Sequence, residues 1–270
     1  MFYNGDVNKP TITSLSNPLV KQARALRQRK ARGESGLFLA EGIHHVGEAV
    51  AANWDIDAII YAPEILTSDF GRELTSRAAL QTKLQPVSAQ VMESLAEKDN
   101  PQGILAIVHQ KRTRLDELAS IRSGVAVVSP QDPGNVGTIL RTLDAVGADV
   151  LFLLDGGVDL YHPTSVRASM GTLFSKPVIQ TSFAEFIKWK RRNTVQLIGT
   201  SAHADSDYRN FQPKSPWILL LGSEQKGLSA EQMAACDTRV SLPMRGRASS
   251  LNLAVAAGVL LYQFVFTLKA

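Results

Sequence analysis

The alternation of hydrophobic and polar residues predicts two successive regions in which strands and helices alternate. In the first region, short apolar runs indicate strands at 36–40, 56–61, 84–87 and 104–109. The stretches around them predict helices at 18–31, 42–52, 69–81 and 88–98. An Asn-Pro pair at 17–18 marks the start of the first helix and Gly33 its end. We therefore assign a smaller α/β domain to residues 1–108.

The second region repeats the alternation with more strongly apolar strands. Strands are predicted at 125–128, 150–154, 178–180, 195–199, 217–221 and 239–242. Helices are predicted at 135–146, 164–174, 183–192, 229–235 and 251–268. Continuous apolar strands joined by helices indicate a parallel sheet covered on both faces. We assign this α/β domain to residues 123–270 and interpret the polar segment 109–122 as a linker or a bridging helix.

Composition narrows the class of protein. The 270 residues are 44% hydrophobic and 20% charged, which excludes a disordered chain or a disulfide scaffold. Cys236 is the single cysteine, and the N-terminus lacks the apolar core of a secretory signal, so we expect a cytoplasmic protein. The uncharged stretch 251–268 is barely long enough to span a membrane and contains two polar amides, so we favour a buried or interface helix. The five histidines lack ligand spacing, and we expect no metal.

Positive charge is concentrated at the N-terminus. Residues 1–34 contain seven Lys and Arg but two Asp and Glu, whereas the rest of the chain is nearly neutral. A basic helix on a neutral body is typical of a protein that binds a polyanion, and nucleic acid fits better than a membrane because few large apolar residues accompany the charge. A solvated helix face is the alternative. The candidate nucleic-acid contacts on this helix are Lys21, Arg24, Arg27, Lys30 and Arg32.

Three glycine-bearing loops are the candidate ligand site. They are 129–137 (SPQDPGNVG), 222–227 (GSEQKG) and 243–251 (PMRGRASSL). Each follows a predicted strand and leads into a helix, so that backbone N–H groups face outward at the edge of the sheet where ligands bind. Any one of them alone could be an ordinary connection. The phosphate-binding GxxxxGK[ST] and GxGxxG patterns are absent.

The three loops resemble motifs of the SpoU/TrmH family of SPOUT RNA 2′-O-ribose methyltransferases. The first motif, N-x-G-x-x-x-R, is matched by Asn135, Gly137 and Arg141. The second, L-G-x-E-x-x-G-[LM], is matched by Leu221, Gly222, Glu224, Gly227 and Leu228. The third, [IL]-P-M-x-G-x-x-S-L-N, is matched by Leu242, Pro243, Met244, Gly246, Ser250, Leu251 and Asn252. Residues 159–174 also resemble a family segment, and residues 11–108 look like the RNA substrate-binding domain of many members.

The resemblance implies a C-terminal trefoil-knot SPOUT domain preceded by an RNA-binding domain of ribosomal-protein type. It further implies a homodimer with the last helix at the interface, and bound S-adenosylmethionine. The residues expected to hold this cofactor are Thr200, Leu221, Gly222, Leu242, Met244, Ser250 and Leu251. Simple core packing is the alternative for the apolar members, and Ser250 could instead cap the last helix.

The expected reaction is transfer of a sulfonium methyl group to a ribose 2′-hydroxyl. Arg141 matches the family's catalytic arginine, and because a guanidinium is a poor base we expect it to stabilise the developing alkoxide and orient a phosphate. Asn135, Glu224 and Asn252 complete the expected catalytic set, with Glu224 placed to orient Arg141 or to meet the methionine amino group. The expected RNA path adds Arg167, Lys226, Arg245 and Arg247.

Two other functions remain open at this stage: a non-catalytic RNA-binding or ribosome-assembly factor, and a methyltransferase that modifies a base. The N-terminal domain favours ribosomal RNA over transfer RNA as the substrate.

Overall fold

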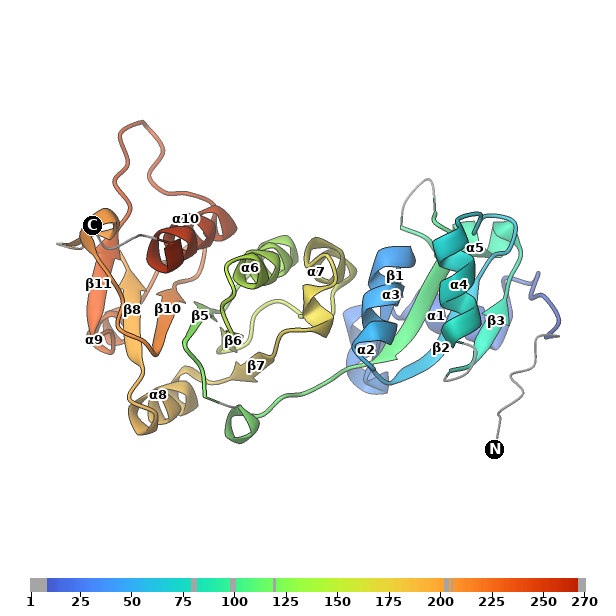
Figure 1. Ribbon diagram of the computed structural model, residues 1–270, viewed down its shortest axis with the longest axis horizontal. Coiled ribbons are helices and arrows are strands. Elements are labelled where there is room, and N and C mark those ends of the chain that lie inside the picture. The colour runs from blue at the N-terminus through green and yellow to red at the C-terminus, as the bar shows by residue number, and fades with distance from the viewer. Residues whose placement is uncertain are drawn as a thin grey trace. The chain divides into compact units, whose positions relative to one another are not determined.

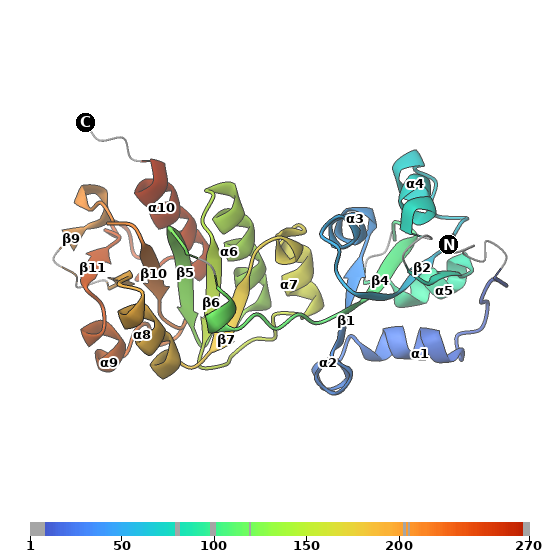
Figure 2. The same cartoon turned by 60° about the horizontal axis from the view of Figure 1, so that its bottom comes forward.

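The computed structural model describes residues 9–78, 82–97, 101–118, 120–201, 204 and 206–266. The chain divides into two compact units (Figures 1 and 2). The N-terminal unit contains Met1–Lys111 and Tyr161–Ser175, and the C-terminal unit contains Arg112–Leu160 and Lys176–Ala270. The segment Tyr161–Ser175, which we expected within the C-terminal domain, therefore packs with the N-terminal unit.

The N-terminal unit is built on a four-stranded mixed sheet. Its strand order is β1 (Leu37–Glu41), β4 (Ile104–His109), β2 (Ile56–Tyr61) and β3 (Leu84–Pro86). Strand β4 is antiparallel to both neighbours, whereas β2 and β3 are parallel. The helices described before the end of β4 are α1 (Pro18–Ala25), α2 (Arg29–Ser35), α3 (Ile43–Ala51), α4 (Asp69–Ala78) and α5 (Ala89–Leu95). The helix end expected at 81 lies outside the described residues. Helix α5 ends at Leu95, because Ala96 is extended, so the end expected at 98 was wrong.

The basic N-terminal segment forms two helices, so the prediction of a single helix at 18–31 was wrong. Asn17 caps α1 as expected, but the chain is extended at Gln28, and α2 then continues through Gly33 to a left-handed Gly36. The buried guanidinium of Arg32 donates hydrogen bonds to the carbonyls of Leu26 and Arg27, 2.8 Å away in each case. These carbonyls lie at the break between the helices, where they lack helical partners.

The segment Tyr161–Ser175 contains α7 (Pro163–Ala168) and the 3-10 turn η2 (Thr172–Phe174) instead of the single helix predicted at 164–174. The chain leaves the helical conformation at Met170 and Gly171, which both have a positive φ. Gly171 has a φ of 85°, and a Cβ atom there would lie 2.5 Å from Cγ of Glu48. The indole N–H of Trp54 donates to the carbonyl of Phe174 at 2.9 Å. The rings of Trp54 and Phe174 both pack against the ring of Phe38. The segment is thus an integral part of the N-terminal core.

The C-terminal unit contains the predicted parallel sheet. Its strand order is β7 (Val178–Thr181), β6 (Val150–Leu154), β5 (Ser123–Val128), β10 (Trp217–Leu221), β8 (Gln196–Thr200), β11 (Thr238–Ser241) and β9 (Ser206–Asp207). Every neighbouring pair is parallel. The helices are α6 (Pro133–Ala145), α8 (Phe183–Arg192), α9 (Ala230–Ala234) and α10 (Leu253–Phe266). The sequence did not reveal β9 or the turn η3 (Tyr208–Asn210), and the segment 109–122 contains one 3-10 turn, η1 (Leu115–Glu117), in place of a bridging helix.

Helix α10 lies against α6 (Figure 1). Its buried face includes Leu260 and Leu261, whereas the opposite face exposes an apolar stripe, defined here as Val255, Val259, Tyr262 and Phe266. The side chains of this stripe are 36–56% exposed, and their spacing of three or four residues places them on one side of the helix. Within the described part of the chain, no helix is long and apolar enough to cross a membrane.

Candidate functional site

The candidate site lies in the C-terminal unit, where the strand order changes direction. The switch lies between the neighbouring strands β5 and β10. On the β5 side follow β6 and β7, and on the β10 side follow β8, β11 and β9. Ligands of open parallel sheets bind beyond the carboxyl ends of the strands at such a switch point. The loops that follow β5 and β10 flank this point, and those after β8 and β11 lie on the adjacent strands. Because the strands are parallel, all three motif loops lie at the carboxyl ends of the strands, on the same side of the sheet.

Glu224 ties the loop after β10 to the loop after β5. Its carboxylate accepts a hydrogen bond from the backbone N–H of Gln131 at 3.1 Å and a longer one from the N–H of Asp132 at 3.4 Å. It also accepts one from Nδ2 of Asn135 at 3.2 Å. Hydrogen bonds to an ionised acceptor are stronger than those between neutral groups, so one side chain fixes both loops. This is a different role from the expected orientation of Arg141.

Asn135 and Asn252 join the third motif to this cluster. Asn135 is buried at the start of α6, and its Oδ1 accepts a hydrogen bond from Nδ2 of Asn252 at 2.9 Å. Oδ1 of Asn252 accepts from the N–H groups of Ala254 and Val255, at 2.9 and 3.2 Å. Asn252 is thus the N-terminal cap of α10, and the alternative that Ser250 caps this helix was wrong. The connected side chains Glu224, Asn135 and Asn252, called here the polar bridge, link the three motifs.

Gly222 lies in a turn that admits no side chain. The N–H of Gly227 donates to the carbonyl of Ser223 at 2.9 Å and closes the turn. A Cβ atom at position 222 would lie 2.1 Å from the carbonyl carbon of Gly227 and 2.4 Å from the backbone nitrogen of Leu228. Because both obstacles are backbone atoms, any larger residue must move the loop. Leu221, the last residue of β10, is buried immediately before it.

The loop between β11 and α10 presents both apolar side chains and backbone donors. Met244 is 37% exposed and Leu251 is 40% exposed, whereas Leu242 is half-buried. Among the described residues, no partner is found for the backbone N–H groups of 244–251. Thr200 ends β8 on the neighbouring strand, where its hydroxyl lies 3.5 Å from the carbonyl of Leu220. These features suit a ligand that has both an apolar ring and hydrogen-bonding groups.

Arg141 is not part of the polar bridge. It lies six residues beyond Asn135 on α6, which corresponds to about 9 Å along the helix and about 120° around it. Its side chain is exposed and makes no hydrogen bond or ion pair with any residue that the structure describes. The neighbouring Thr142 lies against α10, with its methyl group 3.8 Å from the Cβ position of Gly258. Arg141 is therefore on the exposed surface of α6, the helix that packs against α10.

The expected RNA contacts fall into two groups. Lys21, Lys226, Arg245 and Arg247 are exposed, and their side chains have no partner within the described ranges. The others have partners. Lys30 pairs with Glu34 at 3.8 Å, Arg24 donates to Ser94 at 3.1 Å, Arg27 donates to the carbonyls of Leu95 and Ala96, and Arg167 pairs with Glu97 at 2.9 Å. Arg32 is buried, because its guanidinium replaces the missing helical partners at the α1–α2 break, so its expected place on an RNA-facing surface was wrong.

Sequence analysis missed two contributors to the site. Gln131 and Asp132 supply the backbone N–H groups that Glu224 binds. Asp132 also caps α6, since its Oδ1 accepts from the N–H of Gly134 at 2.6 Å. The Asp-Pro pair at 132–133 carried the same cap signal as Asn-Pro at 17–18, and it moves the helix start from 135 to 133. The described residues contain no cluster of His, Cys, Asp or Glu suited to a metal ion, and His203 lies outside them.

The reactivity of Cys236 tests whether its thiol is partly buried in the folded protein. Partial burial, reinforced by the charge of Asp237, raises the pKa of its thiol to about 11. A thiol reacts as the thiolate, so we expect slow alkylation by iodoacetamide at pH 7.5 in the folded protein and acceleration as the pH rises toward 11. Mass spectrometry of labelled protein, with urea-unfolded protein as the reference, measures this. Equal alkylation rates in folded and unfolded protein at pH 7.5 would contradict the partial burial of this thiol.

Comparison with known proteins assigns the class. The model of the SpoU rRNA methylase family matches residues 123–262, and that of the MRM3-like substrate binding domain matches residues 17–106. The chain therefore belongs to the SpoU rRNA methylase family. The family resemblance drawn from the three motifs is confirmed, as is the fold class of a parallel-sheet SPOUT domain preceded by a smaller α/β domain.

Individual relatives match nearly the whole chain. A 23S rRNA (uridine(2479)-2′-O)-methyltransferase of Streptomyces viridochromogenes is 35% identical, with 94% of this chain and 91% of the relative covered. The 23S rRNA (guanosine(2553)-2′-O)-methyltransferase RlmP of Bacillus subtilis is 31% identical, over 93% and 97%. Among solved structures, the AdoMet-bound rRNA methyltransferase of Sinorhizobium meliloti has a TM-score of 0.85 at 34% identity, over 94% and 96%.

Proposed function

We propose that this protein transfers the methyl group of S-adenosylmethionine to a ribose 2′-hydroxyl of ribosomal RNA in the cytoplasm. The observation that carries the proposal is the polar bridge, because it holds the three motif loops together at the switch point of the sheet. The named relatives that match over nearly the full chain are 23S rRNA 2′-O-methyltransferases, which supports ribosomal RNA over transfer RNA and the ribose over a base.

The residues of the loops fit S-adenosylmethionine. The exposed side chains of Met244 and Leu251, with half-buried Leu242, offer an apolar surface for the adenine ring. The free N–H groups of 244–251 and the backbone at Gly222 offer partners for the polar edges of the adenine and for the ribose. Thr200, at the end of β8, and Ser250, just before α10, offer hydroxyl groups. When bound, the cofactor supplies an electrophilic methyl group on a positively charged sulfur.

The chain's own contribution to the reaction is positioning and charge. The polar bridge keeps the loops in one arrangement, so that the donor and the acceptor are oriented before reaction. Arg141 supplies a fixed positive charge where negative charge develops on the ribose oxygen, and its planar fork binds a neighbouring phosphate. Since a guanidinium remains protonated, the proton of the hydroxyl passes to another acceptor, for which the substrate phosphate is available. Lys226, Arg245 and Arg247 extend the positive surface along the RNA.

Two chains associate through the C-terminal domain in this proposal. The apolar stripe of α10 is exposed in the single chain, and contiguous apolar faces of this kind are typical of interfaces. Arg141 lies on α6 beside α10 and so comes close to the second chain. The loops of one chain and the arginine of the other then complete a site together.

We expect a Val259→Asp, Tyr262→Asp double variant to be a monomer, because each unpaired carboxylate opposes burial of the stripe. Light scattering on a sizing column measures the mass of the variant beside the wild-type dimer. An Arg191→Ala, Arg192→Ala variant, altered on the exposed end of α8, is the control and stays dimeric. A wild-type monomer across the micromolar range, or a variant that remains a dimer, would contradict the interface.

Calorimetry with S-adenosylmethionine tests the proposed function against a non-catalytic RNA-binding or assembly factor. We expect saturable binding with one site per chain. RNA binding without any affinity for the cofactor would favour the non-catalytic alternative.

A further inference from the structure

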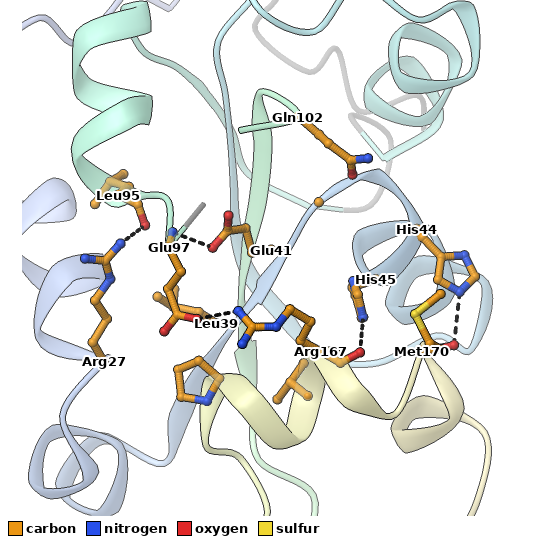
Figure 3. Close-up of a pocket in the computed structure, with 13 residues that line it drawn as sticks. Arg27, Leu39, Glu41, His44, His45, Leu95, Glu97, Gln102, Arg167 and Met170 are labelled. Carbon is orange, nitrogen blue, oxygen red and sulfur yellow. Dashed lines mark hydrogen bonds and ion pairs between the residues drawn. The ribbon is translucent and has the colours of Figure 1, made fainter. Parts of the chain in front are cut away.

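A cavity of about 190 Å³ in the N-terminal unit has no role in the chemistry described above (Figure 3). All of its lining residues belong to that unit. Its walls come from strand β1, the start of α3, the end of α5 and helix α7. Most of the lining surface is apolar, contributed by Leu39, Leu95, Pro163 and Val166. Because a cavity of about 150 Å³ holds a benzene molecule, this one has room for a planar heterocycle.

The rim of the cavity carries carboxylates that are already held in place. Oε2 of Glu41 accepts a hydrogen bond from the N–H of Glu97 at 3.0 Å, and Oε2 of Glu97 accepts one from Nη1 of Arg167 at 2.9 Å. The Oε1 atoms of both carboxylates have no partner among the described residues. Gln102 accepts from the N–H of Ile43 through Oε1 at 2.9 Å, which leaves its amide N–H₂ available. The rim thus presents two acceptors and a donor in fixed positions.

Two histidines fasten the opposite wall. Nε2 of His44 lies 3.0 Å from the carbonyl of Met170, and Nε2 of His45 lies 3.3 Å from the carbonyl of Arg167 (Figure 3). Since a carbonyl oxygen only accepts, Nε2 must donate in both pairs, and it does so in the neutral Nε2–H tautomer and in the charged ring alike. The segment that carries Arg167 and Met170 is therefore held against α3, and the cavity is formed before any ligand binds.

The chemistry of the lining selects one class of ligand. An anion such as a phosphate is disfavoured, because two carboxylates line the rim while Arg27 and Arg167 already bind protein oxygens. A purely apolar group would leave the carboxylates desolvated without partners. A neutral planar ring with N–H donors on its edge satisfies both the apolar walls and the free acceptors. Unpaired nucleobases of RNA have these properties, and proteins read them by such contacts on their exposed edges.

We propose that this cavity takes one unpaired nucleobase of the RNA substrate, one with an exocyclic amino group that donates to Oε1 of Glu41, since the carboxylate of Glu97 is already paired with Arg167. The inference rests on the proposed function, since it names a recognition element for the same RNA. It gives the N-terminal unit a specific reading function in addition to the general attraction of its positive charge.

Two variants of the full-length protein test the pocket. Glu41→Gln keeps an oxygen for the N–H of Glu97 but removes the charge that a base amino group would meet. Met170→Trp introduces an indole ring at a position that lines the cavity and is 45% exposed, so the ring competes with a bound base for the same space. The matched control is Glu73→Gln, which removes an exposed carboxylate of α4 in the same unit. Circular dichroism and thermal unfolding, compared with the wild type, verify that the N-terminal unit of each variant is folded.

The probe is protein-free 23S rRNA transcribed with sparse, cleavable analogues that lack single exocyclic amino groups. We expect both pocket variants to bind this RNA about tenfold more weakly than the wild type and the Glu73→Gln control. We also expect one position at which an analogue weakens binding to the wild type and to the control but not to Glu41→Gln.

Unchanged RNA affinity of both pocket variants, or an interference pattern identical to that of the wild type, would overturn the inference. Failure of the proposed function has a different signature, because the wild type would then transfer no methyl group to any ribose of this RNA, whatever its interference pattern.

Discussion

Arg141→Ala is expected to lower the turnover number by about 10²–10³-fold while the affinity for S-adenosylmethionine stays within about twofold of the wild type. The exposed guanidinium binds no protein group that the structure describes, so its removal disturbs neither the fold nor the polar bridge. The loss should fall on the step in which the ribose oxygen becomes negative. Single-turnover methyl transfer to 23S rRNA and calorimetry with the cofactor measure the two quantities separately.

Two further variants test whether the effect of Arg141 depends on its charge, its planar shape and its position. Arg141→Lys keeps the charge but loses the planar fork, and we expect an intermediate rate. Arg191→Ala, on the exposed end of α8, is the matched control and should turn over like the wild type. An Arg141→Ala protein with the wild-type turnover number would reject the catalytic role, and one that no longer binds the cofactor would indicate a binding role instead.

Gly222→Ala is expected to weaken S-adenosylmethionine binding by more than about 100-fold. The new methyl group would lie 2.1 Å from a backbone carbon of Gly227, so the loop must open and carry its neighbours away from the cofactor. Glu224 follows on the same loop, and its hydrogen bonds to the loop after β5 would break with the displacement. Calorimetry measures the affinity directly.

The control for this glycine is Gly33→Ala, at a helical position where an added Cβ atom meets no atom within 4 Å. We expect that variant to bind the cofactor normally and to be slightly more stable, because alanine favours the helix. If Gly222→Ala also retained wild-type affinity, the turn at 222–227 would not be the cofactor loop.

Mixing these two defective proteins reveals which chain supplies Arg141. Arg141 is separated from the polar bridge of its own chain and lies on α6, the helix that packs against α10. If a site combines the loops of one chain with the arginine of the other, mixed dimers of Arg141→Ala and Gly222→Ala contain one intact site and recover activity. If each chain is self-sufficient, no mixture exceeds the activity of the separate variants.

The parallel sheet and the three loops were predictable because they depend on local patterns. Continuous apolar runs identify buried strands without reference to the rest of the chain. The motifs then place Asn135, Glu224 and Asn252 in the segments that follow such strands. The sequence did not reveal that these three side chains bind one another. Their contacts span 89 and 117 residues, and only the strand order β5–β10–β8–β11 brings them together.

The two main errors have different physical origins, one in local hydrogen bonds and the other in a contact between distant segments. Arg32 carries a charge that indicated a solvent-facing side chain, yet its hydrogen bonds at the α1–α2 break compensate for its burial. The helix predicted at 164–174 is interrupted where Met170 and Gly171 adopt positive φ angles, and at Gly171 the chain passes close to Glu48, more than a hundred residues earlier. The pocket beside Glu41 was missed for the same reason, since its walls come from four elements that are scattered along the sequence.

The central claim is that this chain methylates a ribose of ribosomal RNA. The most direct test is incubation of the purified protein with 23S rRNA and S-adenosylmethionine carrying a deuterated methyl group, followed by complete digestion and mass spectrometry of the nucleosides. We predict a single labelled nucleoside whose label resides on the ribose fragment. Label on the base fragment, or no labelled nucleoside in naked rRNA and in ribosomal subunits alike, would contradict the account.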